Sequence, residues 1–435
     1  MIVTKFGGSS VSSAEQFRKV KDIVLSNPER CVVVTSAAGK RVSTDNKITD
    51  LLYLIHAHIQ YSASFKDLFS SVSNRFLKIQ EELGLKTNIA VDLEALELEL
   101  TKSCPIDYLV SRGEYLTGIL LADYLGYKFI DAKDVILFNY DGTINFEKTE
   151  MLVKDALEVH KRIVIPGFYG AYLDGTIHVM KRGGSDITGS ILARVINASA
   201  YENWTDVSGI LMADPHIINN PKQIEKITYS ELRELSYMGA NVLHEDAIYP
   251  VQDSNIPILI LNTNDTSFKG TMICETIEKD NSINMITGIA GKKDFTVITL
   301  YRHNASNEVG LLRKALEVFE KYKVNVEHVP SGIDNFSIVV STKIIEKVLY
   351  DIVSELGQVV QSENIKVTNN LSLIAIVGRN MAKHVGVSGE LFKTLGDNSI
   401  NIRMIAQGSD EINIIVGVEN EDFEKAIQVL YKTFA

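Results

Sequence analysis

The first 280 residues or so alternate short apolar runs with stretches whose apolar residues recur at helical spacing. Amphipathic helices are predicted over 65–83 and 107–126, and strands over 2–5, 31–35, 129–131, 162–166, 176–180 and 257–261. This alternation predicts an α/β fold: a largely parallel sheet with helices on both faces, whose ligands bind beyond the carboxyl ends of the strands. Lys5, Thr35 and Gly167 lie at such ends.

After about residue 290 the pattern changes and repeats itself. Val309-Gly310 recurs as Val385-Gly386 and residues 324–326 recur as 400–402, both 76 positions later (386 against 310, 400 against 324). The first copy predicts strand, helix, strand, strand and helix over 296–300, 311–322, 324–328, 336–341 and 344–356. That order favours two small ferredoxin-like α+β domains, which pair with each other or across a dimer. A small-ligand site at the paired edges is the favoured interpretation, and a purely structural appendage is the alternative.

The N-terminal strand ends in a lysine and two glycines that open a helix, in the order Lys5, Phe6, Gly7, Gly8 and Ser9. Glycines allow close approach of the backbone, N–H groups at a helix start face anions, and the lysine adds a positive charge. Ser12 and Glu15 have the spacing of a capping box. The segment therefore predicts a phosphate cradle, and a tight turn without a ligand is the alternative.

A second turn of this kind follows the strand near residue 180 and contains Arg182, Gly183, Ser185 and Asp186. Arg182 could grip a carboxylate with two hydrogen bonds, and backbone N–H groups could hold an anion. A plain helix cap at Asp186 is the alternative. Two such turns in one α/β domain favour a shared site of phosphoryl transfer.

Other polar residues lie close to predicted strand ends or helix starts. Glu114, early in a helix, could bind an ammonium group, although an ordinary solvated acid is the simpler interpretation of this residue alone. Asp206 closes a strand where it could meet a nucleotide or its metal, and Ser36 and Thr49 could complete an acceptor pocket. Residues 40–47 predict a mobile loop beside the site, with a mere surface connection as the alternative.

Composition limits the classes of function. A chain of 435 residues should hold two or three domains, and a net charge of -11 without basic clusters argues against nucleic acid as a partner. Cys31, Cys104 and Cys274 lack metal-ligand spacing, and we expect Cys31 to be buried in a strand of a protein from a reducing cytoplasm. No segment approaches the roughly 20 apolar residues of a membrane span, so no membrane partner is expected.

Together and in this order, segments 5–11, 111–114, 181–186, 204–210 with 213–215, and 238–244 resemble those of monofunctional aspartate kinase over essentially the whole chain. The resemblance implies a three-layer amino-acid kinase fold of the carbamate-kinase type at 1–285, with ACT domains at 286–368 and 369–435. It implies phosphorylation of the side-chain carboxylate of L-aspartate by ATP with Mg²⁺, the first step toward lysine, threonine and methionine. A fused homoserine dehydrogenase is not expected.

The resemblance also assigns residues. It implies catalytic roles for Lys5 and Asp186 and no metal site built by the protein. ATP would contact Lys5, Phe6, Gly7, Gly8, Ser9, Thr205, Asp206, Leu211, His216, Asn241 and Val242. Aspartate would contact Ser36, Thr49, Glu114, Arg182, Gly183 and Ser185. An inhibitory amino acid, lysine before threonine, would contact Leu311, Leu312, Asn325, Val326, Glu327 and Ser331, and the ACT domains would form a homodimer or a dimer of dimers.

Four positions depart from the family pattern. Asn241 stands in place of the usual lysine, Glu245 in place of a proline, His216 in place of an arginine and Leu211 in place of a tyrosine. Loss of the lysine predicts weaker ATP binding, or a larger share of the phosphate charge for Lys5, Mg²⁺ and Arg41 or Lys47. Two other functions stay open: a weakened amino-acid sensor and a kinase of another carboxylate.

Overall fold

The computed structural model describes the chain except residues 182, 241–242, 244, 278–284, 409 and 411. The chain divides into two compact units. The first contains Met1–Ile210, Gln223–Ser230 and Val242–Lys279, and the second contains Leu211–Lys222, Glu231–Asn241 and Asp280–Ala435. Among the described residues, no helix is both long and apolar enough to cross a bilayer.

The first unit is built on a sheet with the strand order β11-β13-β12-β8-β1-β2-β5-β3. From β12 to β3 all neighbouring strands run parallel, while β13 is antiparallel to β12. The predicted parallel sheet is therefore confirmed. The strands are β1 (Ile2–Phe6), β2 (Arg30–Thr35), β3 (Lys128–Phe129), β5 (Ile163–Pro166), β8 (Ala200–Thr205), β11 (Lys226–Thr228), β12 (Ile258–Asn262) and β13 (Thr271–Cys274).

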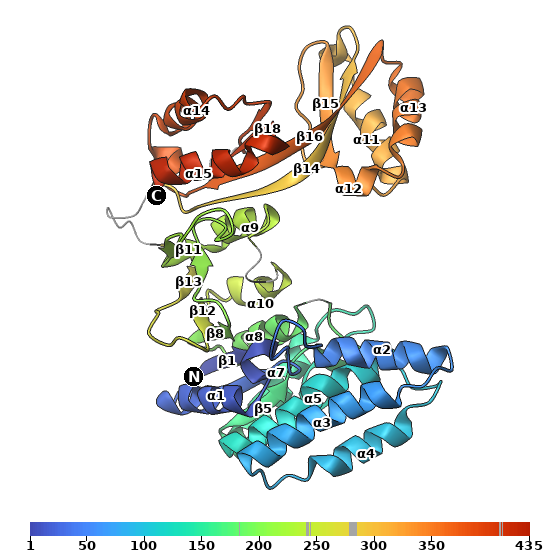
Figure 1. Cartoon of the computed structure of the whole chain (residues 1–435), viewed down its shortest axis with the longest axis vertical. Helices are drawn as coiled ribbons and strands as arrows, with labels where there is room; N and C mark the ends of the chain where they lie inside the picture. The colour runs from blue at the N-terminus through green and yellow to red at the C-terminus, as the bar shows by residue number, and fades with distance from the viewer. Residues whose placement is uncertain (182, 241–242, 244, 278–284, 409, 411) are drawn as a thin grey trace. The chain divides into compact units, whose positions relative to one another are not determined.

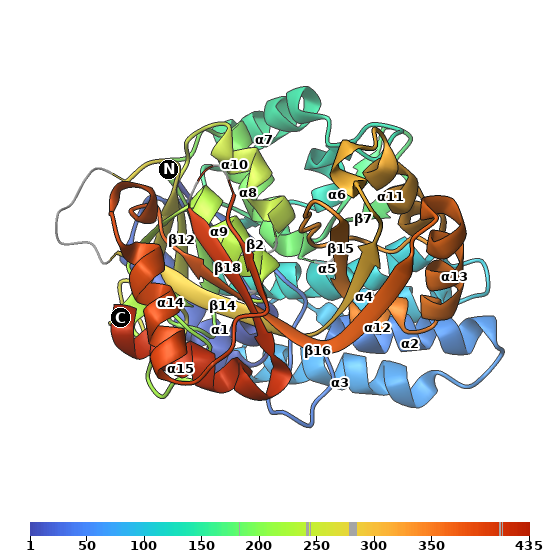
Figure 2. The ribbon, with the colours of Figure 1, turned by 90° about the horizontal axis from the view of Figure 1, so that it is seen from above.

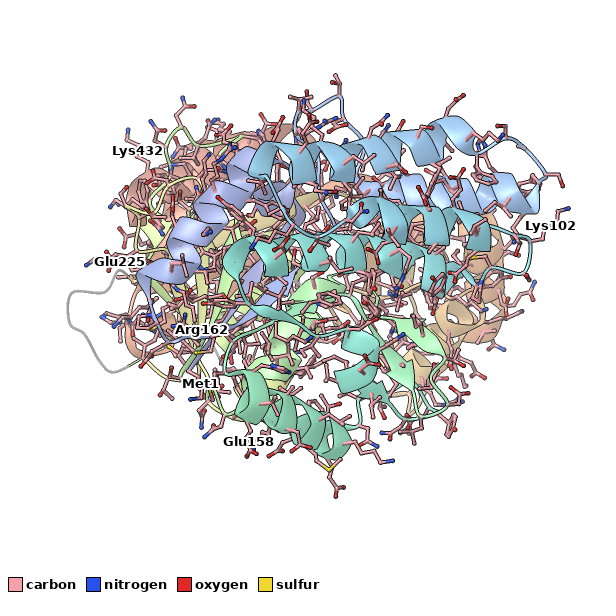
Figure 3. All side chains as sticks on the ribbon, turned by 90° about the horizontal axis from the view of Figure 1, so that it is seen from below. Met1, Lys102, Glu158, Arg162, Glu225 and Lys432 are labelled. Atoms are coloured by element: carbon pink, nitrogen blue, oxygen red, sulfur yellow. The ribbon has the colours of Figure 1, made fainter. Side chains whose placement is uncertain are left out.

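Helices cover both faces of this sheet. One apolar cluster joins Phe6 and Val33 of the sheet to the helices α1 (Ala14–Ser26), α2 (Ile48–Gln60), α3 (Lys66–Leu83), α4 (Ile89–Glu99) and α5 (Ile106–Leu125). Figure 3 shows these blue and cyan helices packed side by side. The other face carries α8 (Gly184–Val195), against which pack α7 (Phe146–His160) and α10 (Tyr249–Gln252). The result is the predicted three-layer α/β arrangement (Figure 1).

One predicted strand of the main sheet lies elsewhere. The run 176–180 forms β7 (Ile177–Val179) in a separate sheet of order β4-β6-β7, with β4 (Leu137–Phe138) and β6 (Tyr169–Tyr172). Its neighbour β6 is antiparallel to it, because the two strands are joined by a tight turn.

Cys31 is also only partly buried, which corrects the expectation of a buried thiol. Further short elements include α6 (Ala132–Val135), β9 (Ile210–Leu211) and β10 (Gln223–Ile224).

The second unit contains one five-stranded sheet of order β15-β14-β16-β18-β17. Its strands are β14 (Gly288–Tyr301), β15 (Asn335–Ser341), β16 (Asn364–Val377), β17 (Met404–Ala406) and β18 (Asn413–Glu419). The last half of β14 pairs with the first half of β16, and the first half of β14 pairs with the last half of β16. Both repeats thus share two long strands, which Figure 2 shows running from one repeat to the other.

Each repeat places two helices on this sheet: α11 (Leu311–Lys321) and α13 (Leu349–Val360), then α14 (Val387–Asp397) and α15 (Phe423–Phe434). Two predictions need correction. Residues 324–328 form no strand; only His328 makes a bridge, to Val339, at the edge of the sheet. The helix predicted over 344–356 is broken into α12 (Thr342–Ile345) and α13.

Candidate active site

The carboxyl ends of the central strands of the first unit meet, as the sequence predicts. Phe6 is the register partner of both Thr35 and Trp204, and Thr35 is the partner of Pro166. The chain leaves these strands into glycine-containing turns, and the Gly167 N–H donates to the Thr35 carbonyl at 2.9 Å. Four segments distant in sequence therefore end at one edge of the sheet.

Lys5 and Asp186 form an ion pair with 2.5 Å between Nζ and Oδ1. Because side chains alternate along a strand, Phe6 packs into the apolar cluster while Lys5 faces the opposite side, where α8 lies. Asn203 joins the pair: its Oδ1 accepts from Lys5 Nζ at 3.2 Å, and its Nδ2 donates to Asp186 Oδ1 at 2.9 Å. Lys5 is only 7% exposed, and these two partners stabilise its buried ammonium group.

The turn after β1 is a short 3-10 helix, Gly8–Val11, and not the start of α1. The capping residue of α1 is Ser13, whose hydroxyl accepts from the Gln16 N–H, so the predicted capping box at Ser12 is wrong. Ser12 instead donates to the Ser9 carbonyl at 3.0 Å. The Gly7 N–H donates to the Trp204 carbonyl, so an anion at this turn would be held by the N–H groups of Gly8 and Ser9.

Glycines permit backbone contacts between the turns at this edge. Gly39 N–H donates to the Gly8 carbonyl at 2.8 Å. A Cβ on Gly39 would lie 2.5 Å from the carbonyl carbon of Gly8, which is far inside any real contact. In the same way, a Cβ on Gly167 would lie 2.7 Å from the Cβ of Ser185. The glycine turns after β2 and β5 thus lie in direct contact with the turn after β1 and with the start of α8.

Glu114 on α5 is 4% exposed, so it is not the solvated acid that the residue alone suggested. Its Oε2 has no hydrogen-bond partner among the described residues. Burial raises the pKa of its carboxyl to about 8, although a backbone hydrogen bond from Ala37 and the charge of Arg112 oppose this. Gly113 lets α5 lie close to Ala37, since a Cβ on Gly113 would lie 2.9 Å from the Cβ of Ala37. A buried acid with a free oxygen suits a cationic ligand.

The helix α8 begins at the second glycine turn. Gly183 is the capping residue, with a φ of 83° that favours glycine, so Asp186 is not the cap and its carboxylate is available to Lys5. Ser185 is buried and lies beside Gly167. Arg182 lies outside the described residues. Ser36 and Thr49 follow β2 and begin α2; Ser36 is partly buried.

The loop 40–47 is tied to α3. Asp45 accepts two hydrogen bonds from Arg75, both at 2.8 Å, and one from Arg41 Nε at 2.8 Å. The hydrogen bond from Arg41 and the charges of both arginines hold the pKa of the Asp45 carboxyl well below its usual range. Arg41, considered as a source of charge for the phosphates, is therefore paired within its own loop. The mobility of the loop stays a prediction.

The residues expected around the nucleotide belong to both units. Thr205 ends β8 in the first unit and Asp206 follows it, and the Thr205 hydroxyl donates to the Asp206 carboxylate at 3.2 Å. Leu211 and the exposed His216 belong to the second unit. Asn241 and Val242 lie outside the described residues. Among the residues described, no three His, Cys, Asp or Glu side chains form a group that could hold a metal.

The expected effector residues lie in the first repeat of the second unit. Leu311 is buried in its core, Leu312 is exposed at its surface, and Val326 packs against the core. The Glu327 carboxylate accepts a hydrogen bond from the hydroxyl of Tyr237 on α9 (Tyr229–Tyr237). The other two expected residues, on either side of Glu327 in sequence, are Asn325 and Ser331.

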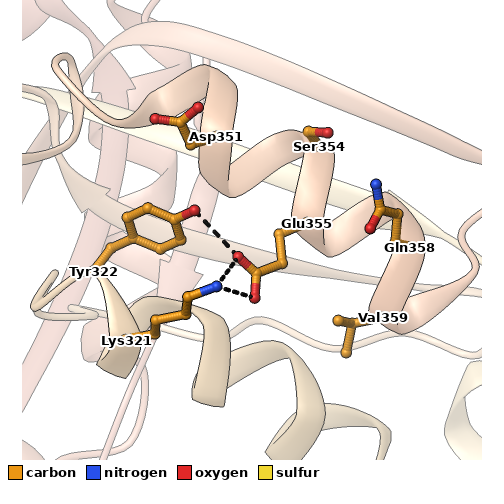
Figure 4. A pocket seen from close by; sticks show the side chains of 7 residues that line it. All are labelled: Lys321, Tyr322, Asp351, Ser354, Glu355, Gln358 and Val359. Carbon is orange, nitrogen blue, oxygen red and sulfur yellow. Dashed lines mark hydrogen bonds and ion pairs between the residues drawn. The ribbon is translucent and has the colours of Figure 1, made fainter.

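A separate hollow of this repeat lies between α11 and α13 (Figure 4). One of its two carboxylates is already paired: Glu355 accepts from Lys321 at 2.8 and 2.9 Å and from the Tyr322 hydroxyl at 3.1 Å, while Asp351 also lines the hollow. The hollow is lined by none of the effector residues predicted from the sequence. It therefore adds no support to the expected effector site.

Sequence reasoning missed three residues that the structure places at these sites: Asn203, Arg75 and Tyr237. Asn203 could have been found, because it lies two residues before the end of its strand and on the same face as Thr205. Arg75 and Tyr237 sit within helices whose sequences give no sign of their long-range partners.

A parallel sheet with two glycine turns over a Lys-Asp pair, followed by a duplicated α+β sheet, defines an amino acid kinase with a regulatory part. The profile of the amino acid kinase family matches residues 1–262, and that of an ACT domain matches residues 374–434. The chain belongs to the amino acid kinase family, and its activity within that family is that of an aspartate kinase.

Full-length relatives support this assignment. Aspartokinase 3 of Bacillus subtilis is 36% identical over 450 residues, which cover 100% of this chain and 98% of that protein. The crystal structure of Clostridium acetobutylicum aspartate kinase, described as an allosteric enzyme, is 47% identical with a TM-score of 0.95 and full coverage of both chains. Escherichia coli aspartokinase III is 25% identical; its complex with aspartate and ADP has a TM-score of 0.76, and its complex with lysine and aspartate 0.78, each covering at least 99% of both chains.

Proposed function

We propose that this aspartate kinase transfers the γ-phosphoryl group of ATP to the side-chain carboxylate of L-aspartate at the edge formed by β1, β2, β5 and β8. The observation that carries the proposal is the Lys5–Asp186–Asn203 cluster beside the Gly7-Gly8 turn, together with the buried carboxylate of Glu114. The Escherichia coli relative has been solved with aspartate and ADP, which are the expected ligands. The product, 4-phospho-L-aspartate, would open the route to lysine, threonine and methionine in the cytoplasm.

The phosphates would lie over the first glycine turn. The N–H groups of Gly8 and Ser9 begin a 3-10 turn, where N–H groups have no carbonyl partner within the turn, and Lys5 supplies a buried positive charge beside them. Asp186 and Asn203 hold the ammonium of Lys5, so that it meets the transferring phosphoryl group in one orientation. Phe6 and Gly7 shape the turn, since Gly7 places no side chain near Lys5 Nζ.

The aspartate would lie between the second glycine turn and α5. Its ammonium group would pair with Glu114, whose Oε2 lacks a partner in the described residues. Its carboxylates would meet Arg182, Gly183 and Ser185 at the start of α8, with Ser36 and Thr49 completing the pocket. An ammonium ligand would stabilise the ionised form of Glu114, which burial disfavours in the unliganded protein.

The nucleotide would extend toward Thr205 at the end of β8 and Asp206 just after it. Contacts of the nucleotide with Leu211, His216, Asn241 and Val242 stay a prediction from the sequence. Mg²⁺ enters such reactions bound to nucleotide phosphates and needs only one or two protein carboxylates. Asp206, the residue after β8, has the chemistry to contact Mg²⁺. When bound, Mg²⁺ would neutralise charge on the phosphates.

The residues act by alignment and charge neutralisation. The attacking group is a carboxylate, already a nucleophile at neutral pH, so no strong general base is required. Glu114 and the α8 turn fix the aspartate, and the Gly8 turn with Lys5 fixes the phosphoryl group. Asp186 holds the Lys5 ammonium in place while negative charge moves between the two substrates.

An aspartyl-hydroxamate assay with ATP, Mg²⁺ and L-aspartate tests the proposal, with L-glutamate as the competing acceptor. Robust turnover with aspartate, lost in Lys5→Met, is expected. A Lys5→Met protein that keeps most of its turnover would contradict the role of Lys5. No turnover of the wild type with either acceptor would favour the amino-acid sensor instead.

For regulation, we propose that an amino acid binds the first ACT repeat near Glu327 and inhibits the enzyme. Lysine is the first choice and threonine the second. The Escherichia coli relative has been solved with lysine and aspartate, which supports lysine as the effector. The ACT repeats would also join the chains into a homodimer or a dimer of dimers.

The contact between Glu327 and Tyr237 gives this regulation a test. Lysine binding at Glu327 would compete with the Tyr237 hydroxyl, which already donates to that carboxylate. Tyr237→Phe removes the competing donor, so inhibition should require several-fold less lysine than in the wild type, as measured by the half-inhibitory concentration. Unchanged rate and melting temperature of the wild type in saturating lysine would exclude lysine as the effector.

A further inference from the structure

Arg75 on α3 is 5% exposed and reaches acceptors on three residues of the loop that follows β2. Its Nη1 donates to the Gly39 carbonyl at 2.9 Å, and its Nη2 donates to both carboxylate oxygens of Asp45 at 2.8 Å. Nη2 also contacts the Asn46 carbonyl at 3.4 Å. A planar guanidinium can serve several acceptors at once, whereas a lysine ammonium on a flexible stem acts as a single point charge.

These contacts lead directly to the glycine turn proposed to hold the phosphates. The Gly39 residue that Arg75 binds through its carbonyl donates its own N–H to the Gly8 carbonyl at 2.8 Å. The backbones of Gly8 and Gly39 are so close that a Cβ on Gly8 would lie 3.3 Å from the Cα of Gly39. Gly39 therefore has no free space in which to move alone, and a displacement of Gly39 must also displace Gly8.

The same arginine fixes the other end of the loop. Asp45 and Asn46 lie just before Ile48, whose N–H donates to the Ala38 carbonyl at 3.2 Å as α2 begins. Thr49, proposed to contact aspartate, is the next residue. One buried guanidinium thus holds the segment between the phosphate turn and the aspartate pocket at both of its ends.

We propose that Arg75 is a positioning residue for phosphoryl transfer, which acts through Gly39 on the Gly8 turn and through Asp45 on the start of α2. The proposal rests on the function proposed above, because it concerns the geometry of the same site. In this proposal Arg75 contacts neither ATP nor aspartate. Its loss should misplace the phosphate turn and leave the chemistry of Lys5 and Asp186 unchanged.

The test compares Arg75→Lys with a matched control, Arg30→Lys. Arg30 is also largely buried and donates to Glu202 at 2.8 and 3.1 Å, but it lies at the first residue of β2, the opposite end of the strand. Both variants keep a positive charge and should lose a similar amount of melting temperature. Each is assayed in the full chain, at a temperature where circular dichroism shows it folded.

Arg75→Lys should lower kcat by about tenfold to a hundredfold, with smaller changes in the KM for ATP and for aspartate, because misalignment acts on the transition state. Arg30→Lys should keep kcat within about twofold of the wild type at a comparable loss of melting temperature. Equal kcat losses in the two variants, or an unchanged kcat in Arg75→Lys, would overturn the proposal.

Asp45→Asn separates the two routes from Arg75, since it leaves the bond to the Gly39 carbonyl in place. Its kcat should fall much less than that of Arg75→Lys, and an equal fall would rule out the route through Gly39. Lys5→Met in the same assay distinguishes the proposals. If the wild type shows no turnover, the proposed function fails; if Lys5→Met loses turnover while Arg75→Lys retains it, the positioning role alone fails.

Discussion

Replacing Glu114 by glutamine should make the unliganded protein more stable at neutral and alkaline pH while it weakens the binding of aspartate. The carboxyl is 4% exposed and Oε2 has no partner among the described residues. Burial raises its pKa to about 8 from an ordinary value of 4.5. At any pH at which this carboxyl is ionised in the unfolded chain but protonated in the folded protein, Glu114 therefore lowers the free energy of unfolding.

The sign follows from proton binding. Between pH 4.5 and 8 the Glu114 carboxyl is protonated in the folded protein and ionised in the unfolded chain, so the folded state binds more protons and stability falls as pH rises. Each pH unit in this window lowers the free energy of unfolding by about 1.4 kcal/mol. From pH 5 to pH 8 the free energy of unfolding falls by about 3 to 4 kcal/mol, and the Glu114→Gln variant does not lose this stability because an amide does not titrate.

The assay is the melting temperature of the variant minus that of the wild type, measured without substrates at pH 5 and at pH 8. The difference should grow by about 10 °C between the two pH values. Comparing two pH values cancels the cost of burying the amide itself. Glu202→Gln is the control: Glu202 is equally buried but bonded to Arg30 and to the indole of Trp204, so this variant should be less stable than the wild type.

Kinetics supply the second half of this prediction. The ionised carboxylate binds the substrate ammonium, so kcat/KM for aspartate in the wild type should rise as pH increases toward 8 and then level off. In the Glu114→Gln variant this rise should vanish, and the KM for aspartate should increase about a hundredfold with little change in the KM for ATP. A stability difference that is the same at pH 5 and pH 8, or an unaltered KM for aspartate, would refute the reasoning.

Two further predictions concern the phosphate side of the site. Asp186→Asn removes the partner 2.5 Å from Lys5 Nζ and should lower kcat about a hundredfold; a steady-state kcat within about threefold of the wild type would contradict it. Gly39→Ala places a methyl group 2.5 Å from the carbonyl carbon of Gly8 and should lower kcat at least about tenfold. Its control, Gly396→Ala, meets no atom within 4 Å in α14 and should leave kcat unchanged, so equal losses would dismiss the steric argument.

The sequence predicts the central strands and their ends well, because apolar runs between helices carry a strong signal. The sequence fails where two local structures have the same pattern of apolar and polar residues and only side-chain contacts in the fold decide between them. Ser12 and Ser13 are both able to cap a helix, and only the preceding 3-10 turn places Ser13 at the start of α1. Residues 324–328 alternate apolar and polar side chains as a strand would, but they lie at a sheet edge where only His328 makes a bridge.

Glu114 and Asp186 show the same limit within the site. The helix α5 is buried on several sides, with Leu109, Val110 and Leu116 all within the core, so its apolar pattern cannot reveal which way an acid points. Asp186 in a first helical turn suits a cap as well as an ion pair. The role becomes clear only when β1 and α8 are brought together, which no local pattern encodes.

The alternation of β1 couples the stability of the fold to the chemistry of the site. Phe6 is fully buried in the cluster with α1 to α5, while Lys5 projects to the side of α8 and meets Asp186. A shift of one residue in the register of β1 would carry Lys5 into the apolar cluster and Phe6 toward the polar groups of Asp186 and Asn203. Burying an unpaired ammonium costs several kcal/mol, about as much as a small domain's whole margin of stability. The register that keeps polar groups out of the apolar core is therefore also the one that places Lys5 beside the phosphate turn.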